Sequence, residues 1–139
     1  YLMPKFIETG KHQIKFWMEG SVIKYQKIKP TLSEVLDLCE SKDCGSHETQ
    51  ITNFLVDIFL EENNEFMVAY ELKKTQIYLK IFNNTDTGFT QLHSNIINKG
   101  ENKDVKLLSI KNKFIQVYFT IIDKEVTLNG KVTNYSGPY

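Results

Sequence analysis

The strongest constraint on the fold is the alternation of apolar and polar residues along residues 12–28. Apolar Ile14, Phe16 and Met18 alternate with polar side chains, and the pattern resumes beyond Gly20. A period of two residues is that of a β-strand with one buried face. Because glycine tolerates the backbone of a bulge, the stretch predicts one long strand that bends at Gly20, as at the corner of a barrel.

Most of the remaining chain also has the composition of β-structure. Residues 51–73 are rich in Ile, Phe, Leu and Val, and the pair Asn63-Asn64 at their middle predicts a hairpin turn. In the following strand we expect Ile77, Leu79 and Ile81 to share one face. Further strands are expected over residues 105–110, 113–122 and 125–135.

Two short helices are predicted beside these strands. Thr31 and Glu34 have the spacing of a capping box, in which Thr caps the helix and Glu reaches back to it. An amphipathic helix is therefore expected over residues 32–40. One or two helical turns are expected within residues 88–98, with Leu92, Ile96 and Ile97 turned inward. At 139 residues, the whole chain 1–139 is expected to form a single, mainly β domain.

The charge pattern bears on the partners of the chain. Its 17 basic residues are all Lys, its acidic residues also number 17, and residues 31–65 alone hold nine acids against one Lys. Arginine is the usual bidentate reader of guanine, and tight phosphate binding needs clustered cations, so we expect weak nucleic-acid binding. No apolar run approaches the roughly 20 residues of a membrane span, and residues 1–13 lack the features of a signal peptide.

Few residues have the spacing of a chemical site. Cys39, Cys44 and His47 lie close together, but the tight pair of cysteines typical of zinc knuckles is missing. A Cys39–Cys44 disulfide is geometrically possible, and two reduced cysteines without metal are the favoured state. No nucleophile elbow, phosphate-binding glycine loop or zinc-protease motif occurs. We therefore expect a protein that is not an enzyme and uses no cofactor.

Aromatic and Lys side chains on strand faces are the candidate binding residues. Lys15 and Trp17 alternate with Phe16 and Met18 and should therefore face away from the core. Aromatic rings interleaved with Lys can stack on bases or anchor a protein partner. About two thirds of the aromatic residues are nevertheless expected to fill the core of a small barrel. The candidates are Lys15, Trp17, Lys24, Tyr25, Tyr70 and Tyr78.

The order of these elements resembles the OB-fold, a five-stranded Greek-key barrel. The opening GKHQIKFWMEGSVIKYQ and the final strand EVTLNGKVTNY are similar to the small single-OB subunits of replication protein A and of the telomeric CST (Ctc–Stn–Ten) complex. In that family the helix at 32–40 would be an insertion. The resemblance implies a nuclear subunit without enzymatic activity, which packs against a larger OB-fold-containing protein and binds single-stranded DNA weakly.

Two other functions are open. The sequons at Asn83 and Asn134, together with the two cysteines, favour an extracellular β-barrel or β-sandwich that binds a ligand or a host protein, as lipocalins do. An intracellular β-rich adaptor domain is the third reading. In all three cases the expected activity is binding.

Overall fold

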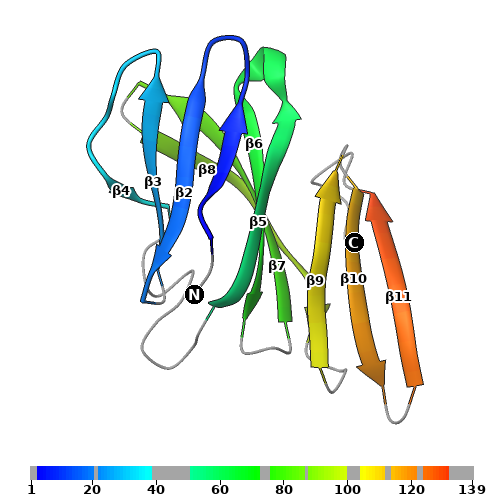
Figure 1. Cartoon of the computed structure of the whole chain (residues 1–139). Coiled ribbons are helices and arrows are strands. Elements are labelled where there is room, and N and C mark those ends of the chain that lie inside the picture. Colours follow the sequence, from blue (N-terminus) through cyan, green and yellow to red (C-terminus); the bar gives the residue numbers. More distant parts are fainter. Residues whose placement is uncertain are drawn as a thin grey trace. The chain divides into compact units, whose positions relative to one another are not determined.

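The computed structural model describes residues 3–20, 22–38, 51–72, 76–86, 88–99, 104–111, 114–121 and 124–131. These residues form eleven β-strands and one short 3-10 turn, which confirms a mainly β protein (Figure 1). Contacts within the chain group it into two compact units, residues 1–51 and 52–139. No helix in the described part has the length and apolarity that a membrane crossing needs.

The first unit holds a four-stranded sheet. Its strands are β1 (Lys5–Glu8), β2 (Gln13–Glu19), β3 (Val22–Lys29) and β4 (Leu36–Asp37), and they pair in the order β1-β2-β3-β4. All three pairings are antiparallel. Alternate side chains on one face of this sheet are buried: Ile7, Ile14, Phe16, Ile23 and Tyr25. The alternation seen in the sequence therefore marks the buried face correctly.

Gly20 corrects the first prediction, because it ends a strand instead of bending one. Glu19 pairs directly with Val22, so the chain reverses within two residues and β2 and β3 form a hairpin. Gly20 has a φ of 62°. Tight two-residue hairpin loops need a positive φ at their first central position, which glycine adopts without strain. The dipeptide Gly20-Ser21 between two alternating runs is itself a hairpin signal.

The helix predicted over residues 32–40 is also wrong for the residues described. Residues 32–35 follow an irregular path and lead into β4, while residues 39 and 40 lie outside the described part. Ser33 explains the difference, since its N–H donates to the Lys27 carbonyl at 2.9 Å and its Oγ accepts from the Lys27 N–H at 3.0 Å. Gln26 Nε2 adds a third bond, to the Ser33 carbonyl. These bonds hold the segment beside β3, and tertiary pairing overrides the local capping signal.

The second unit is built from two further antiparallel meanders. The first comprises β5 (Ile51–Leu60, which begins at the division between the units), β6 (Glu65–Leu72), β7 (Gln76–Thr85) and β8 (Gly88–Lys99), in that order. The turn η1 (Glu61–Asn63) joins β5 to β6 and ends on Asn64, whose φ is 56°. The hairpin turn predicted at Asn63-Asn64 is thus confirmed.

The other meander of this unit comprises β9 (Asp104–Lys111), β10 (Phe114–Ile121) and β11 (Lys124–Lys131), paired in the order β11-β10-β9. Both of its pairings are antiparallel. β10 and β11 correspond to the two final strands that the sequence predicts. Residues 132–135 lie outside the described part.

One apolar cluster packs β9 and β10 against the four-stranded sheet of the second unit. Its buried members are Phe59, Met67, Ala69, Ile77, Leu79, Ile81, Leu107 and Ile115. The shared face predicted for Ile77, Leu79 and Ile81 is confirmed. Beside this cluster lies the buried carboxylate of Glu71, which accepts bonds from Thr52 Oγ1 at 2.8 Å and from the Leu107 N–H. Glu71 therefore links β5, β6 and β9 while both its oxygens stay hydrogen-bonded, as a buried carboxylate requires.

β8 replaces the helical turns predicted within residues 88–98. It pairs with β7 along its whole length, with Lys99 opposite Gln76 at one end and Gly88 opposite Thr85 at the other. Its Leu92 and Ile96 are exposed instead of turned inward. Apolar residues four positions apart lie on one face of a helix, and they also lie on one face of a strand. Their spacing alone therefore does not distinguish a helix from a strand.

The expected five-stranded barrel is corrected as well, because the described strands form open sheets of four, four and three strands. A Greek-key barrel needs strands distant in sequence to pair and close the ring. Here every neighbour within a described sheet is the next strand along the chain. Each sheet is therefore a meander with two free edges among the described strands.

Candidate functional site

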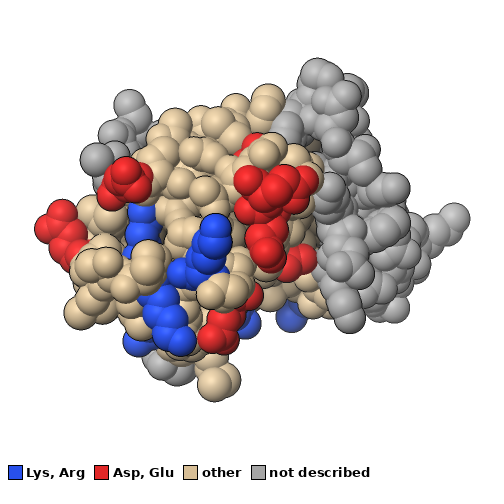
Figure 2. Space-filling view, turned by 90° about the horizontal axis from the view of Figure 1, so that it is seen from above, with Lys and Arg blue, Asp and Glu red and all other residues tan. Residues whose placement is uncertain are grey.

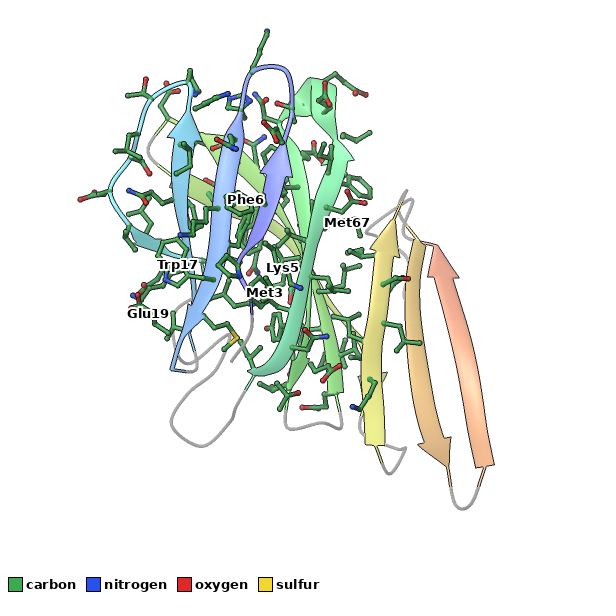
Figure 3. All side chains as sticks on the ribbon, viewed as in Figure 1. Met3, Lys5, Phe6, Trp17, Glu19 and Met67 are labelled. Atoms are coloured by element: carbon green, nitrogen blue, oxygen red, sulfur yellow. The ribbon has the colours of Figure 1, made fainter. Side chains whose placement is uncertain are left out.

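The outward face of the β1–β4 sheet gathers the candidate binding residues of the first unit. Because Ile14 and Phe16 of β2 are buried, the side chains of Lys15 and Trp17 lie on the opposite face. The strand register places Phe6 of β1 opposite Lys15, and Lys24 of β3 opposite Trp17. We call these four residues the Trp17 face, and Figure 3 shows Phe6 and Trp17 on their two strands.

Trp17 is held by its neighbours on the same strand. The Lys15 ammonium lies 5.4 Å from the centre of the indole ring, a cation–π distance. Trp17 Nε1 donates a hydrogen bond of 3.0 Å to Glu19 Oε1, and Figure 3 shows the two side chains together at the end of β2. The indole N–H is thus satisfied while the ring stays partly exposed. A ring already fixed in this way loses little conformational freedom when a partner binds.

Lys24 is neutralised by a carboxylate next to it. Its ammonium lies 2.5 Å from Asp37 Oδ1, on β4. The hydrogen bond to Asp37 is the main cause that raises the pKa of Lys24 above 10.5, aided by attraction to Asp37 and Glu19 and opposed by slight burial. Lys24 is therefore charged at neutral pH, but its charge is already balanced within the sheet.

Two exposed apolar side chains lie on β1 or just before it, and β1 is the neighbour of β2. Phe6 lies on β1, an edge strand, and 54% of it is exposed. Met3, two residues before β1, is 70% exposed. Single exposed apolar residues are normal on protein surfaces, but Phe6 lies opposite Lys15, the residue whose ammonium contacts the Trp17 ring, so the two aromatic residues share one sheet face.

The six residues predicted from the sequence do not form one site. Lys15, Trp17 and Lys24 lie together as described. Tyr25 is buried beneath the same sheet, where its ring lies 6.2 Å from that of Phe16.

Tyr70 and Tyr78 belong to the second unit, on β6 and β7. They are a cross-strand pair with parallel rings 5.3 Å apart, and Tyr70 is fully buried. These two rings therefore stabilise their own sheet.

The sequence did not indicate two residues of this region: Phe6, which belongs to the Trp17 face, and Asp37, which is paired with Lys24 of that face. Phe6 lies in the short alternating run KFIE, a signal too brief to stand out. Asp37 was expected on a helix, so its pairing with Lys24 had no sequence signal. Both depend on strand pairing. It places Phe6 opposite Lys15, 9 positions further along the chain, and Asp37 beside Lys24, 13 positions before it.

No described residues form a group of three or more His, Cys, Asp or Glu side chains suited to a metal ion. Cys39, Cys44 and His47 lie outside the described part of the chain. Their expected state, reduced and without metal, stays a prediction.

Charges of both signs are present on the molecule's surface. Figure 2 shows Lys side chains and acidic side chains on the same view, with neither sign covering it. On and beside the Trp17 face the cations Lys15 and Lys24 meet the anions Glu19 and Asp37. The local charge is therefore close to zero, like that of the whole chain.

Comparisons of the chain with protein-family models, with curated proteins and with solved structures found no match. Its function therefore has to be inferred from the geometry of its own residues.

Proposed function

We propose that the chain is a protein-binding domain without enzymatic activity, and that the Trp17 face contacts the partner. The observation that carries the proposal is the Trp17 ring, fixed by Lys15 and Glu19 on an outward sheet face that also holds exposed Phe6, opposite Lys15 on β1. Tryptophan is the residue most enriched among those that dominate the energy of protein interfaces. A rigid aromatic residue contributes contact area at a small entropic cost.

The charges near the face suit a protein partner better than a nucleic acid. Lys24 is paired with Asp37, and Glu19 lies beside the indole ring. Each phosphate contact needs a cation free to replace counterions, so paired cations contribute little affinity. Protein interfaces instead have an aromatic centre and a rim of mixed charge.

Affinity capture from cells that naturally express the protein tests this proposal. We expect the unchanged chain to retain a partner in constant ratio, and the double variant Phe6→Ser/Trp17→Ser to lose it. Leu108→Ser is the matched control, since Leu108 is a 48% exposed apolar residue on β9, in the second unit. Equal recovery of the partner by the double variant, with its urea midpoint unchanged, would contradict the proposal.

A narrower function is the second candidate: a nuclear subunit of a single-stranded-DNA-binding or telomere-maintenance complex, whose partner is a larger OB-fold-containing protein. Two observations support it. The opening and closing segments resemble small OB subunits, and Lys15 over the Trp17 ring is the pairing of cation and aromatic ring on which bases stack. In this role the chain would bind protein first and DNA only weakly.

A salt titration of oligonucleotide binding tests the DNA part. We expect single-stranded DNA to bind with a Kd of about 100 µM or weaker at physiological salt, because the chain has no net charge and its Lys residues are spread along the sequence instead of clustered. Nanomolar affinity with a steep salt dependence would make DNA the primary ligand and overturn the order proposed here.

A further inference from the structure

β8 has the longest uncharged stretch of any edge strand in the described sheets, and its one charged residue is Lys99 at its end. It is the last strand of the β5-β6-β7-β8 sheet, and its residues 88–98 include no Lys, Asp or Glu. In the other edge strands β1, β4, β5, β9 and β11 no uncharged stretch is longer than the six residues 51–56 of β5. Charged side chains on edge strands are a common device that prevents pairing between sheets. β8 lacks this device over eleven successive residues.

The side chains of β8 suit a strand that acquires a neighbour. Leu92 is 41% exposed and Ile96 is 37% exposed. Thr90, Gln91 and Ser94 are exposed polar residues whose side chains can donate and accept hydrogen bonds. Register shifts against β7 place an extra residue of β8 at Leu92 and at Ile97, and the pairing is regular over His93–Ile96. The strand therefore presents a short regular segment that ends on exposed Ile96 and is preceded by exposed Leu92.

We propose that β8 pairs in antiparallel fashion with β8 of a second copy of this chain. A twofold axis at Ser94 places Leu92 opposite Ile96 of the partner subunit, so the two exposed apolar residues meet twice. No charged residue between positions 90 and 98 opposes its like in this register. The chain as a whole carries no net charge, so long-range repulsion between two copies is absent as well.

A second copy fits this edge better than an unrelated partner, because the edge is complementary to itself. Antiparallel pairing about a twofold axis matches a strand with its own sequence reversed. Here that match places Leu92 opposite Ile96, His93 opposite Asn95 and Ser94 opposite itself, while Gln91 lies opposite Ile97. The four-stranded sheet would then continue through β8 into an eight-stranded sheet of the dimer.

Analytical ultracentrifugation of the full chain tests the dimer, with two variants of opposite charge. At a chain concentration of about 100 µM we expect twice the mass of one chain, because dimerisation depends on concentration. Leu92→Lys/Ile96→Lys should be a monomer, and so should Leu92→Glu/Ile96→Glu. An equal mixture of the two variants should dimerise again, since each Lys then lies opposite a Glu. Leu108→Lys, on the exposed edge strand β9, is the control and should dimerise like the unchanged chain.

The rescue by mixing separates a lost interface from a lost fold, because an unfolded variant would not regain association. A monomeric unchanged chain at this concentration overturns the proposal. Dimers that persist in both charged variants, or open-ended aggregates in place of dimers, also overturn it. These results leave the proposed function untouched, since no residue of the Trp17 face is changed.

Discussion

The orientation of Trp17 is set by residues two positions away on the same strand. Lys15 and Glu19 share the outward face of β2 with Trp17 because side chains of a strand alternate between faces. One provides a cation over the ring and the other accepts the indole N–H. A cation–π contact at an exposed site contributes about 0.5 to 1 kcal/mol, so the pair orients the ring more than it stabilises the fold.

The ion pair between Lys24 and Asp37 gives a pH-dependent prediction. Asp37→Asn should lower the free energy of unfolding by about 0.5 kcal/mol, since Asp37 is exposed and solvent screens the pair. The pKa of Lys24 is raised above 10.5, so the pair stabilises the folded state below that pH. The stabilisation is lost as pH rises through the higher pKa of the folded state.

Urea unfolding of the unchanged chain and of Asp37→Asn at a series of pH values measures the difference in their free energies of unfolding. The difference between them should stay constant around neutral pH and shrink only above 10.5. Glu34→Gln removes one negative charge from the loop before β4 and is the control. A difference that shrinks near pH 7 would show that Lys24 does not carry the effect.

At the scale of elements, Gly20 determines the β2–β3 hairpin. Its φ of 62° is unfavourable for other residues, and no heavy atom beyond its chain neighbours lies within 4 Å of the position that a Cβ would take. Gly20→Ala should therefore destabilise the protein by about 1 kcal/mol through backbone strain alone. Gly20→Asn should cost less, because Asn adopts positive φ more readily.

Gly10→Ala is the matched control for this prediction. Gly10 also has open space around its Cβ position, and its φ is not in the positive range. Thermal or urea unfolding should show a loss for Gly20→Ala and little change for Gly10→Ala. Equal effects at both positions would contradict the role of backbone conformation.

Strand alternation was readable from the sequence, while the pairing of strands was not. The period of two residues around Phe16 and the turn at Asn63-Asn64 are local properties, and both were predicted correctly. The helix expected after Thr31 failed because Ser33 bonds to Lys27 of β3, a contact that local sequence does not encode. β8 was missed because apolar residues four apart satisfy a helix and a strand alike.

The candidate face shows the same division. Lys15 and Trp17 follow from alternation along β2 alone. Phe6 joins them only because β1 pairs with β2 in one particular register, and Asp37 joins Lys24 only through β4. Tyr25 and Tyr70 were candidates by residue type, but both are buried. Alternation alone places Tyr25 on the side of β3 that holds Ile23, whereas Tyr70 is buried because both sides of β6 are covered, which the sequence of β6 does not decide.

At the scale of the whole molecule, the two proposed surfaces belong to different units of the chain. The Trp17 face lies within residues 1–51, and β8 lies within residues 52–139. They also differ in chemistry, since one combines aromatic rings with paired charges and the other is an uncharged strand edge. The two surfaces share no residue, so a substitution in one leaves the residues of the other unchanged.

Photo-cross-linking from position 6 in cells that naturally express the protein tests the central claim, that the Trp17 face binds a protein. Phe6 is replaced by the photoreactive residue p-benzoylphenylalanine, which keeps an aromatic side chain on the face, and Leu108 is replaced in the same way as the control. We predict one discrete protein adduct from position 6, absent from position 108 and lost when Trp17→Ser is added. No adduct from position 6, or an adduct that Trp17→Ser leaves unchanged, would contradict the claim.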